Sequence, residues 1–277
     1  MREHVARRAT AVHPLTGPLI LPLDEIAAAI PLAEAAGAGQ DGEPPIALSI
    51  VTPSGRLEDA LHAVDGTSAL RLHAIELKTD PEPGAWRTEL PPVAQAAAAE
   101  GAPEIFVELT ADQVADGALE AIAGTAVRLK YRTGGVRKDL FPSPEQLASV
   151  LHEAVERGLS LKLTAGLHQA VRFTHPATGF THHGFLNIAV AILRAQAGED
   201  QARLVEALRS RDAEAVVAEA GRSDAWRDVY RSFGTCDIPE PVESLQSLGL
   251  LPADLLDGYR QTLAATAPAA DDPTPKE

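Results

Sequence analysis

Charged residues recur at every second position in four short, otherwise apolar segments of the chain. These segments have the sequences LHAIELKTD, EIFVELT, TAVRLKYRT and LSLKLTA. Successive side chains of a β-strand point to opposite faces, so each segment, folded as a strand, would place its charges on one face and its aliphatic residues on the other. The polar face would carry Glu76, Lys78, Glu108, Lys130, Arg132, Lys162 and Thr164.

Such a face predicts a binding site for a small anionic molecule. Buried charges are costly unless they pair with one another or with a ligand, and this set contains more cations than carboxylates. Arg132 can bind a carboxylate or phosphate through two parallel hydrogen bonds, with Arg137 or Arg172 assisting from nearby loops. The turn that follows Arg132 offers backbone amides to the same anion. Its residues are Thr133, Gly134 and Gly135.

Lysines within parallel strands also suggest covalent chemistry with a carbonyl compound. An amine that lies close to other cations and away from water has a lowered pKa and becomes a nucleophile. We therefore expect Lys162 to be the nucleophile and Lys130 its cationic neighbour. Glu108 and His168 are the expected proton-transfer groups. The remaining polar residues of the face, Glu76, Lys78 and Thr164 among them, are expected to contact the substrate.

Two of these segments resemble parts of a known enzyme family. LKLTAG (161–166) is similar to the K-x-S-T-G segment around the Schiff-base lysine of deoxyribose-phosphate-type class I aldolases, and KYRTGGVR (130–137) is similar to the K-x-S-G-G-I-R segment around their second lysine. Here the two segments occur in the reverse order, and one more residue precedes the two glycines. The resemblance implies a lyase reaction through a Schiff base on Lys162.

A second resemblance extends over the latter half of the chain. The segments LKYRTGG, FPSPEQLA, LKLTAGLH, HHGFLN and SFGTCDIPEPVESLQSLGLL are similar to those of a family of uncharacterised bacterial (α/β)-barrel-like proteins. This similarity implies that the segments form one site, and it names no reaction. Thr235 and Asp237 flank Cys236 at the positions where the resemblance leads us to expect serines.

Histidines cluster just after the last of the four charged segments. We expect His168 at the mouth of the site, and His183 at the start of a helix whose N-terminus attracts anions, with Asn187 one turn further on. His168 and His183 would act as proton shuttles or ligand donors. We interpret His175 and His182 as solvated loop residues.

Two other functions stay open. The four histidines, with Glu108 or Asp237, could hold Zn²⁺ in a metal-dependent hydrolase, although the sequence contains no HExxH or CxxC motif. A non-catalytic binding protein for an anionic metabolite would need the same polar face. The mixture of Lys, Glu and His favours an enzyme, because these side chains can titrate near neutrality when their pKa values are shifted. We expect no cofactor.

The predicted fold is α/β. Strand-like segments at 46–53 and 232–238 flank the four charged ones, and helical segments separate them, as in βα units with a parallel sheet. Capping boxes at Thr110 and Ser143 mark two helix starts. We expect a TIM-like (β/α) barrel, whether closed, incomplete or irregular, rather than an open doubly wound sheet, because the turn after 46–53 lacks a GxGxxG motif.

We expect a single domain over residues 1–262, with a helical insertion at about 184–231 and a disordered tail over 263–277. The net charge of −15 and the pI near 5.0 argue against nucleic-acid and membrane partners. One cysteine, no signal-peptide pattern and no long apolar run indicate a cytoplasmic protein. A homo-oligomer stays open.

Overall fold

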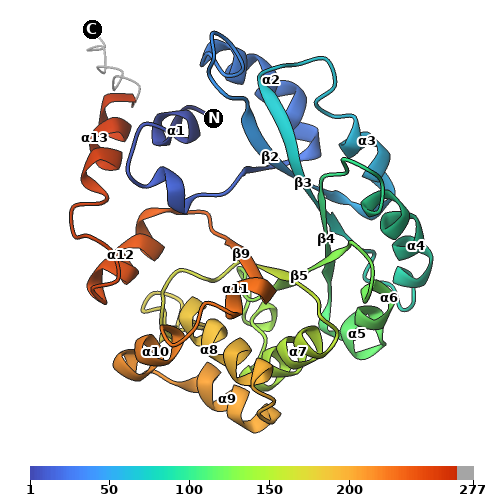
Figure 1. Ribbon diagram of the computed structural model, residues 1–277, viewed down its shortest axis with the longest axis vertical. Coiled ribbons are helices and arrows are strands. Elements are labelled where there is room, and N and C mark those ends of the chain that lie inside the picture. Colours follow the sequence, from blue (N-terminus) through green and yellow to red (C-terminus); the bar gives the residue numbers. More distant parts are fainter. Residues whose placement is uncertain (267–277) are drawn as a thin grey trace, which may run out of the picture.

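A computed structural model describes residues 1–266 as a mixed α/β fold around one curled sheet (Figure 1). Seven strands run in the order β1-β2-β3-β4-β5-β6-β9, and every neighbouring pair is parallel. The strands are β1 (Leu19–Pro22), β2 (Ile46–Pro53), β3 (Leu70–Lys78), β4 (Glu104–Leu109), β5 (Arg128–Arg132), β6 (Leu161–Thr164) and β9 (Tyr230–Gly234). A small antiparallel hairpin joins β7 (Phe173–Thr174) to β8 (Thr181–His182).

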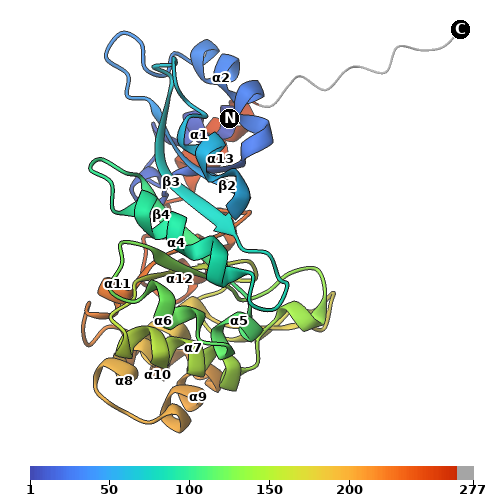
Figure 2. The ribbon, with the colours of Figure 1, turned by 90° about the vertical axis from the view of Figure 1, so that its right-hand side faces the viewer.

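Helices line the outside of the curl, so the sheet has a convex face under helices and a concave face toward the middle of the molecule (Figures 1 and 2). The helices of the described chain are α1 (Arg2–Arg7), α2 (Ile26–Ala35), α3 (Leu57–Leu61), α4 (Trp86–Ala97), α5 (Ala111–Ala115), α6 (Ala118–Ile122), α7 (Pro144–Glu156), α8 (Phe185–Gln196), α9 (Gln201–Arg209), α10 (Ala213–Ala220), α11 (Trp226–Val229), α12 (Pro239–Ser247) and α13 (Asp257–Thr266), of which α1, α12 and α13 lie at the open side of the curl. None of the helices in this part of the chain is both long and apolar enough to cross a membrane.

The main hydrophobic core lies between the sheet and these helices. Alternate strand residues such as Ile75, Val107, Leu129 and Leu163 are fully buried in it. Each such side chain contributes about 1.5–3 kcal/mol when it leaves water. The predicted division of the strands is confirmed: aliphatic residues face the helices, and charged residues occupy the concave face.

The sheet does not close on itself among the described residues. β1 and β9 are its two edges, and no backbone hydrogen bonds join them. The two ends of the described chain lie beside this opening, where α1 packs against α13. A second small core stabilises them there, formed by Val12, Val242, Leu256 and Tyr259.

Most predicted elements are confirmed, with changes at their ends. The capping boxes at Thr110 and Ser143 both form, and four helices occupy the predicted insertion before β9. The sequence analysis missed β1 and the β7–β8 hairpin, which are only four and two residues long per strand. The predicted tail starts too early, because α13 continues to Thr266; residues 267–277 lie outside the described part.

Two glycines allow the loops after β5 and β6 to touch. A Cβ atom on Gly134 would lie 2.8 Å from the Cα of Gly166 and 2.9 Å from Cε1 of Phe141. Gly166 has a φ of +77°, and its own Cβ would lie 3.0 Å from the Cα of Gly134. Only glycine at both positions permits this contact, which fixes the mouth of the concave face.

We predict that Gly134→Ala lowers the free energy of unfolding by about 1–3 kcal/mol, because the methyl group overpacks a backbone-to-backbone contact. Urea denaturation measures the change. Gly17→Ala is the matched control, since its Cβ would meet nothing within 4 Å. Equal stability of the two variants would contradict the prediction.

Candidate functional site

Charged side chains from four adjacent strands form a continuous chain of ion pairs on the concave face. Glu76 of β3 places Oε1 2.6 Å from Nζ of Lys162 and Oε2 2.9 Å from Nζ of Lys130. Lys130 lies 2.8 Å from Oε2 of Glu108, whose Oε1 accepts a 3.2 Å hydrogen bond from Nε of Arg132. We call these five residues the charge network.

Strand register brings the network together. Glu108 is the partner of Lys130 across β4 and β5, and Lys130 is the partner of Lys162 across β5 and β6. Burial then isolates it from water, with Glu76, Lys130 and Lys162 only 1%, 3% and 5% exposed. Toward the mouth, the Arg132 side chain is 37% exposed. The network is therefore dry at its base and open to solvent at Arg132.

The network controls the ionisation of its carboxylates. Burial alone would raise the pKa of Glu76, but the charges of Lys130 and Lys162 and its hydrogen bonds lower the pKa to about 2. Burial opposes ionisation of Glu108 in the same way, and Lys130 and Arg132 lower the pKa of this carboxyl below its ordinary value. Both groups are carboxylates at neutral pH.

Two residues that the sequence analysis missed complete the base of the network. The Ser49 hydroxyl of β2 donates a 2.5 Å hydrogen bond to Oε1 of Glu76. The Phe106 ring lies on the concave face beside them, with its centroid 5.8 Å from Nζ of Lys162. A lone serine within the apolar run IALSIVTP was the available signal for Ser49. Phe106 gave none, because it looks like an ordinary core residue.

The remaining strand residues stand apart from the network. Lys78 is exposed at the end of β3 and forms no ion pair with any described residue. Thr164 is half-buried at the end of β6, where its Oγ1 would lie 3.2 Å from a Cβ on Gly234. Thr164 thus lies where β6 meets the edge strand β9.

The turn after β5 is tightly packed. The Thr133 hydroxyl is fully buried and donates a 2.6 Å hydrogen bond to the Ala165 carbonyl. Gly134 packs on Gly166, and a Cβ on Gly135 would lie 2.4 Å from Cδ1 of Leu140. These contacts account for the glycines, and the anion-binding role of the turn stays a prediction. Arg137, further along, is exposed and pairs with Asp139.

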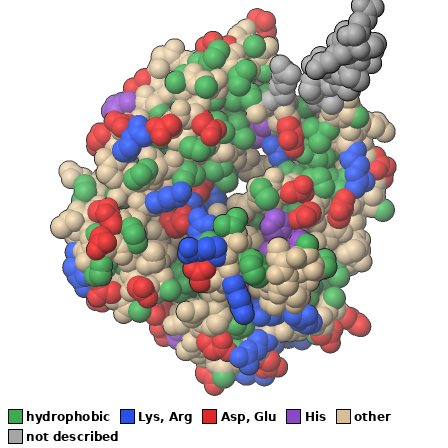
Figure 3. Space-filling model, turned by 180° about the vertical axis from the view of Figure 1, so that it is seen from behind, with side chains coloured by type: hydrophobic (Ala, Val, Ile, Leu, Met, Phe, Trp, Pro, Cys, Tyr) green, Lys and Arg blue, Asp and Glu red, His purple; other side chains and the backbone are tan. Residues whose placement is uncertain are grey.

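Histidines surround the mouth beside the turn, and Lys, Arg and His side chains gather near the middle of this side of the molecule (Figure 3). Nδ1 of His168 lies 2.5 Å from Oε2 of Glu240, a partner on α12 that the sequence analysis did not identify. A carboxylate at Nδ1 fixes the orientation of an imidazole ring. His168 with Glu240 therefore has the arrangement of an acid–base pair.

His182 is not the solvated loop residue that we expected. It is 8% exposed and packs against the rings of Phe141 and Phe173, with centroids 4.7 and 4.8 Å away. Nδ1 lies 2.9 Å from the Gly166 carbonyl oxygen, and burial lowers the pKa of the ring. His175 is half-buried beside it, with ring centroids 6.0 Å apart.

His183 and Asn187 have structural partners that correct their predicted roles. Nε2 of His183 donates to the Pro142 carbonyl at 2.8 Å, Arg172 lies 3.2 Å from Nδ1, and burial lowers the pKa of the ring to about 4. Asn187 is fully buried; its Oδ1 accepts from the Arg172 amide, and its Nδ2 donates to Ala207. Neither side chain is free to bind a ligand.

The N-terminus of α8 is not an anion site either. Its first two backbone amides, on Phe185 and Leu186, already donate to the carbonyls of Gln169 and Ala170. A helix N-terminus attracts anions only through amides without internal partners.

A cleft with a volume of about 1150 Å³ reaches the network from the open side of the sheet. It runs along β9 between the N-terminal segment, α10, α11 and α12, and Lys162 and Ser232 both line it. Ser232 is the partner of Lys162 in the pairing of β6 with β9. Lys162 is thus the member of the network that a molecule in this cleft would meet. Cys236 is exposed and lines the same cleft.

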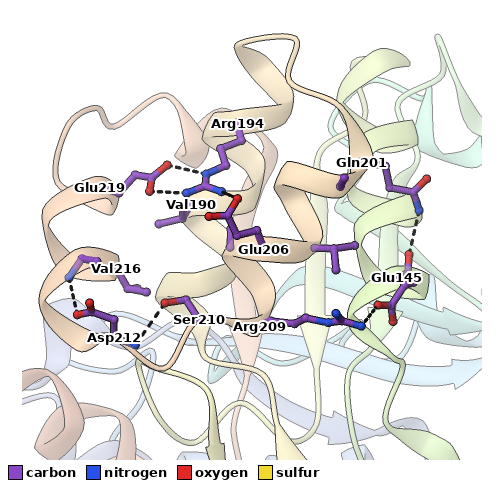
Figure 4. Close-up of a pocket in the computed structure, with 14 residues that line it drawn as sticks. Glu145, Val190, Arg194, Gln201, Glu206, Arg209, Ser210, Asp212, Val216 and Glu219 are labelled. Atoms are coloured by element: carbon purple, nitrogen blue, oxygen red, sulfur yellow. Dashed lines mark hydrogen bonds and ion pairs between the residues drawn. The ribbon is translucent and has the colours of Figure 1, made fainter.

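A second pocket lies among α7, α8, α9 and α10, and its charged side chains point mainly toward one another (Figure 4). Arg194 binds both carboxylate oxygens of Glu219, at 2.7 and 2.8 Å, and Arg209 pairs with Glu145. These pairs hold the four helices together, so the first cleft is the better candidate for a functional site.

No protein-family model, curated protein or solved structure matches this chain. Among residues 1–266, no group of three or more His, Cys, Asp or Glu side chains is arranged to hold a metal ion. Three of the four predicted histidine ligands, His168, His182 and His183, instead have the hydrogen-bond partners described above.

We predict that Glu76→Gln lowers the free energy of unfolding at pH 7 by about 3–5 kcal/mol, because it leaves the buried ammonium of Lys162 without a carboxylate and that of Lys130 with Glu108 alone. The pKa of Glu76 is about 2 when folded against an ordinary 4.5, so its stabilising effect is present above pH 4.5 and is lost as the pH falls toward 2. The difference between wild type and variant should therefore shrink over that range in urea titrations.

Glu104→Gln is the control, because its ion pair with Arg128 joins the same sheet but is about one-third exposed, at 27% and 32%. Its effect should stay below about 1 kcal/mol at every pH. A loss at Glu76 no larger than this would mean that the buried ion pairs contribute no more than surface pairs.

Proposed function

We propose that the protein is an enzyme that forms a Schiff base between Lys162 and a small anionic carbonyl compound, in a lyase reaction of the aldolase type. The observation that carries the proposal is the position of Lys162, the one residue of the charge network that lines the cleft. The curled parallel sheet is consistent with an incomplete TIM-like barrel, in which active sites lie at the carboxyl ends of the strands.

The ion pairs distinguish the two lysines. Lys130 contacts two carboxylates, Glu76 and Glu108, whereas Lys162 contacts Glu76 alone. If Lys162 gives up its charge, Glu76 keeps the ion pair with Lys130 and the hydrogen bond from Ser49. Neutralising Lys130 would instead remove the group that joins both carboxylates. This asymmetry favours Lys162 as nucleophile and Lys130 as the fixed cation.

The charges support an anionic substrate. The network combines three cations with two carboxylates, and Arg132 is its exposed end. An anionic substrate would complete the charge balance of the network, and Arg132 could bind two oxygens at once, although Arg132 does not itself line the cleft.

The reaction needs proton transfer at neutral pH. The Lys162 amine adds to the carbonyl carbon, the carbonyl oxygen leaves as water, and the resulting iminium withdraws electrons from the neighbouring C–C bond. Glu76 is a weak base for these steps, since its pKa is about 2. His168, oriented by Glu240, is the better proton carrier, and Glu108 is the second candidate.

One observation favours a second function. Both lysines are ion-paired with Glu76. A binding protein for an anionic metabolite would stabilise buried ammonium groups in the same way. Such a protein would bind the same anions and form no covalent adduct. The metal-dependent hydrolase has no comparable support.

We predict that borohydride treatment with small keto acids and aldehydes gives a stable adduct, detected by intact-mass analysis, on the wild-type protein. The adduct should disappear in Lys162→Ala. In Lys130→Ala it should still form, about 10-fold or more slowly, because the positive charge of Lys130 beside the reacting group is lost. Lys78→Ala is the control, since this exposed lysine lies outside the network. An adduct that survives Lys162→Ala would refute the assignment, and none in any sample would favour the binding protein.

A further inference from the structure

The cleft along β9 contains buried hydrogen-bond donors that lack partners. Within residues 1–266, Nε of Arg7, Nε1 of Trp226 and the hydroxyl of Tyr230 are buried without a hydrogen-bond partner, and all three residues line this cleft. Tyr230 is only 5% exposed, and its ring centroid lies 6.1 Å from that of Trp226. Buried polar groups almost always have partners, so three such groups on residues of one cleft favour a ligand that carries hydrogen-bond acceptors.

The hydrogen-bonding chemistry of these three groups defines the kind of ligand atom that would pair with them. Arginine and tryptophan nitrogens only donate hydrogen bonds, and a tyrosine hydroxyl donates readily. The complementary group is therefore an acceptor oxygen, as in a carboxylate or phosphate. These donors lie outside the charge network, so they are a separate observation from the ion pairs at Lys162.

Charge around the cleft favours an anion. The acidic lining residues are already engaged: Glu3 accepts from the Tyr259 hydroxyl, and Asp224 pairs with Arg227 at 3.4 Å. Arg7 contacts His4 at 3.0 Å but has no carboxylate partner in the described chain, and neither has the exposed Arg231. Two cations thus stand uncompensated in a protein whose net charge is −15.

Apolar surface in the same cleft indicates a chain or ring on the ligand. Leu15, Ile20 and Leu250 line it and are 51%, 36% and 44% exposed. Side chains of this kind usually avoid water where an alternative exists. The volume of about 1150 Å³ also exceeds what a compound of a few carbons would fill.

We propose that the cleft binds an amphipathic organic anion, a carboxylate with an apolar chain, whose oxygens accept hydrogen bonds from Tyr230 and Trp226 near the charges of Arg7 and Arg231. The chain lies along Leu15, Ile20 and Leu250. Because Lys162 lines the same cleft, a carbonyl on this ligand would meet the proposed nucleophile; only this last point rests on the proposed function. The substrate class then becomes keto or aldehyde acids with an apolar chain.

The test uses octanoate, which has no aldehyde or ketone and cannot form a Schiff base. The chain has two tryptophans, so Trp86→Phe leaves Trp226 as the sole tryptophan, and its fluorescence reports on the cleft. We expect saturable binding of octanoate, and binding at least about 10-fold weaker for acetate, which lacks the chain, and for octylammonium, which reverses the charge.

Tyr230→Phe removes only the unpaired hydroxyl, so it should weaken octanoate binding by about 10-fold while the melting temperature stays the same or rises. Tyr131→Phe is the control, because this equally buried tyrosine lies outside the cleft. Arg7→Gln should also weaken binding, whereas Arg71→Gln, at an exposed position on β3, should not.

Three results would overturn the proposal: no saturable fluorescence change with octanoate, equal affinity for octylammonium, or unchanged affinity in Tyr230→Phe. Failure here is distinguishable from failure of the proposed reaction. A borohydride adduct on Lys162 without octanoate binding would refute only the amphipathic ligand. Octanoate binding without an adduct would refute only the Schiff-base chemistry.

Discussion

The concave face of this protein depends on one buried carboxylate. Strand register sets Lys130 beside Lys162, and two ammonium groups in that position would repel each other in a region of low dielectric. Glu76 lies between them, with one oxygen toward each amine, and Ser49 supplies a further hydrogen bond. β2, β3, β5 and β6 are thereby tied together on the side of the sheet that has no aliphatic core.

The two faces of the sheet differ in composition: the convex face is aliphatic and the concave face is charged. On the convex face, residues such as Ile75 and Leu129 pack against helices as in any α/β protein. On the concave face, ion pairs replace aliphatic packing, which is a costly way to fill an interior. The open edge at β9 lets a cleft reach this face from the side, and Lys162, although only 5% exposed, lines that cleft.

Period-two patterning made much of this predictable. Alternation in AIELK and RLKYR assigns Glu76 and Lys130 to the face opposite the helices, and the structure agrees. Partners were harder to predict, because they depend on register and on distant segments: Ser49 and Glu240 reach Glu76 and His168 from far along the chain. His183 misled the analysis, since a histidine buried at a structural hydrogen bond cannot be told from a ligand-binding one by its type alone.

The late position of β9 in the sequence affects how the protein folds. β6 has no neighbour on one side until the chain has passed through α8, α9, α10 and α11 and returned as β9, where Leu161 pairs with Tyr230. Contacts between residues so far apart form slowly, because the intervening chain must be ordered first. α12 and the N-terminal segment then complete the cleft from opposite ends of the sequence. During synthesis on the ribosome, the charge network can assemble well before the cleft that leads to it.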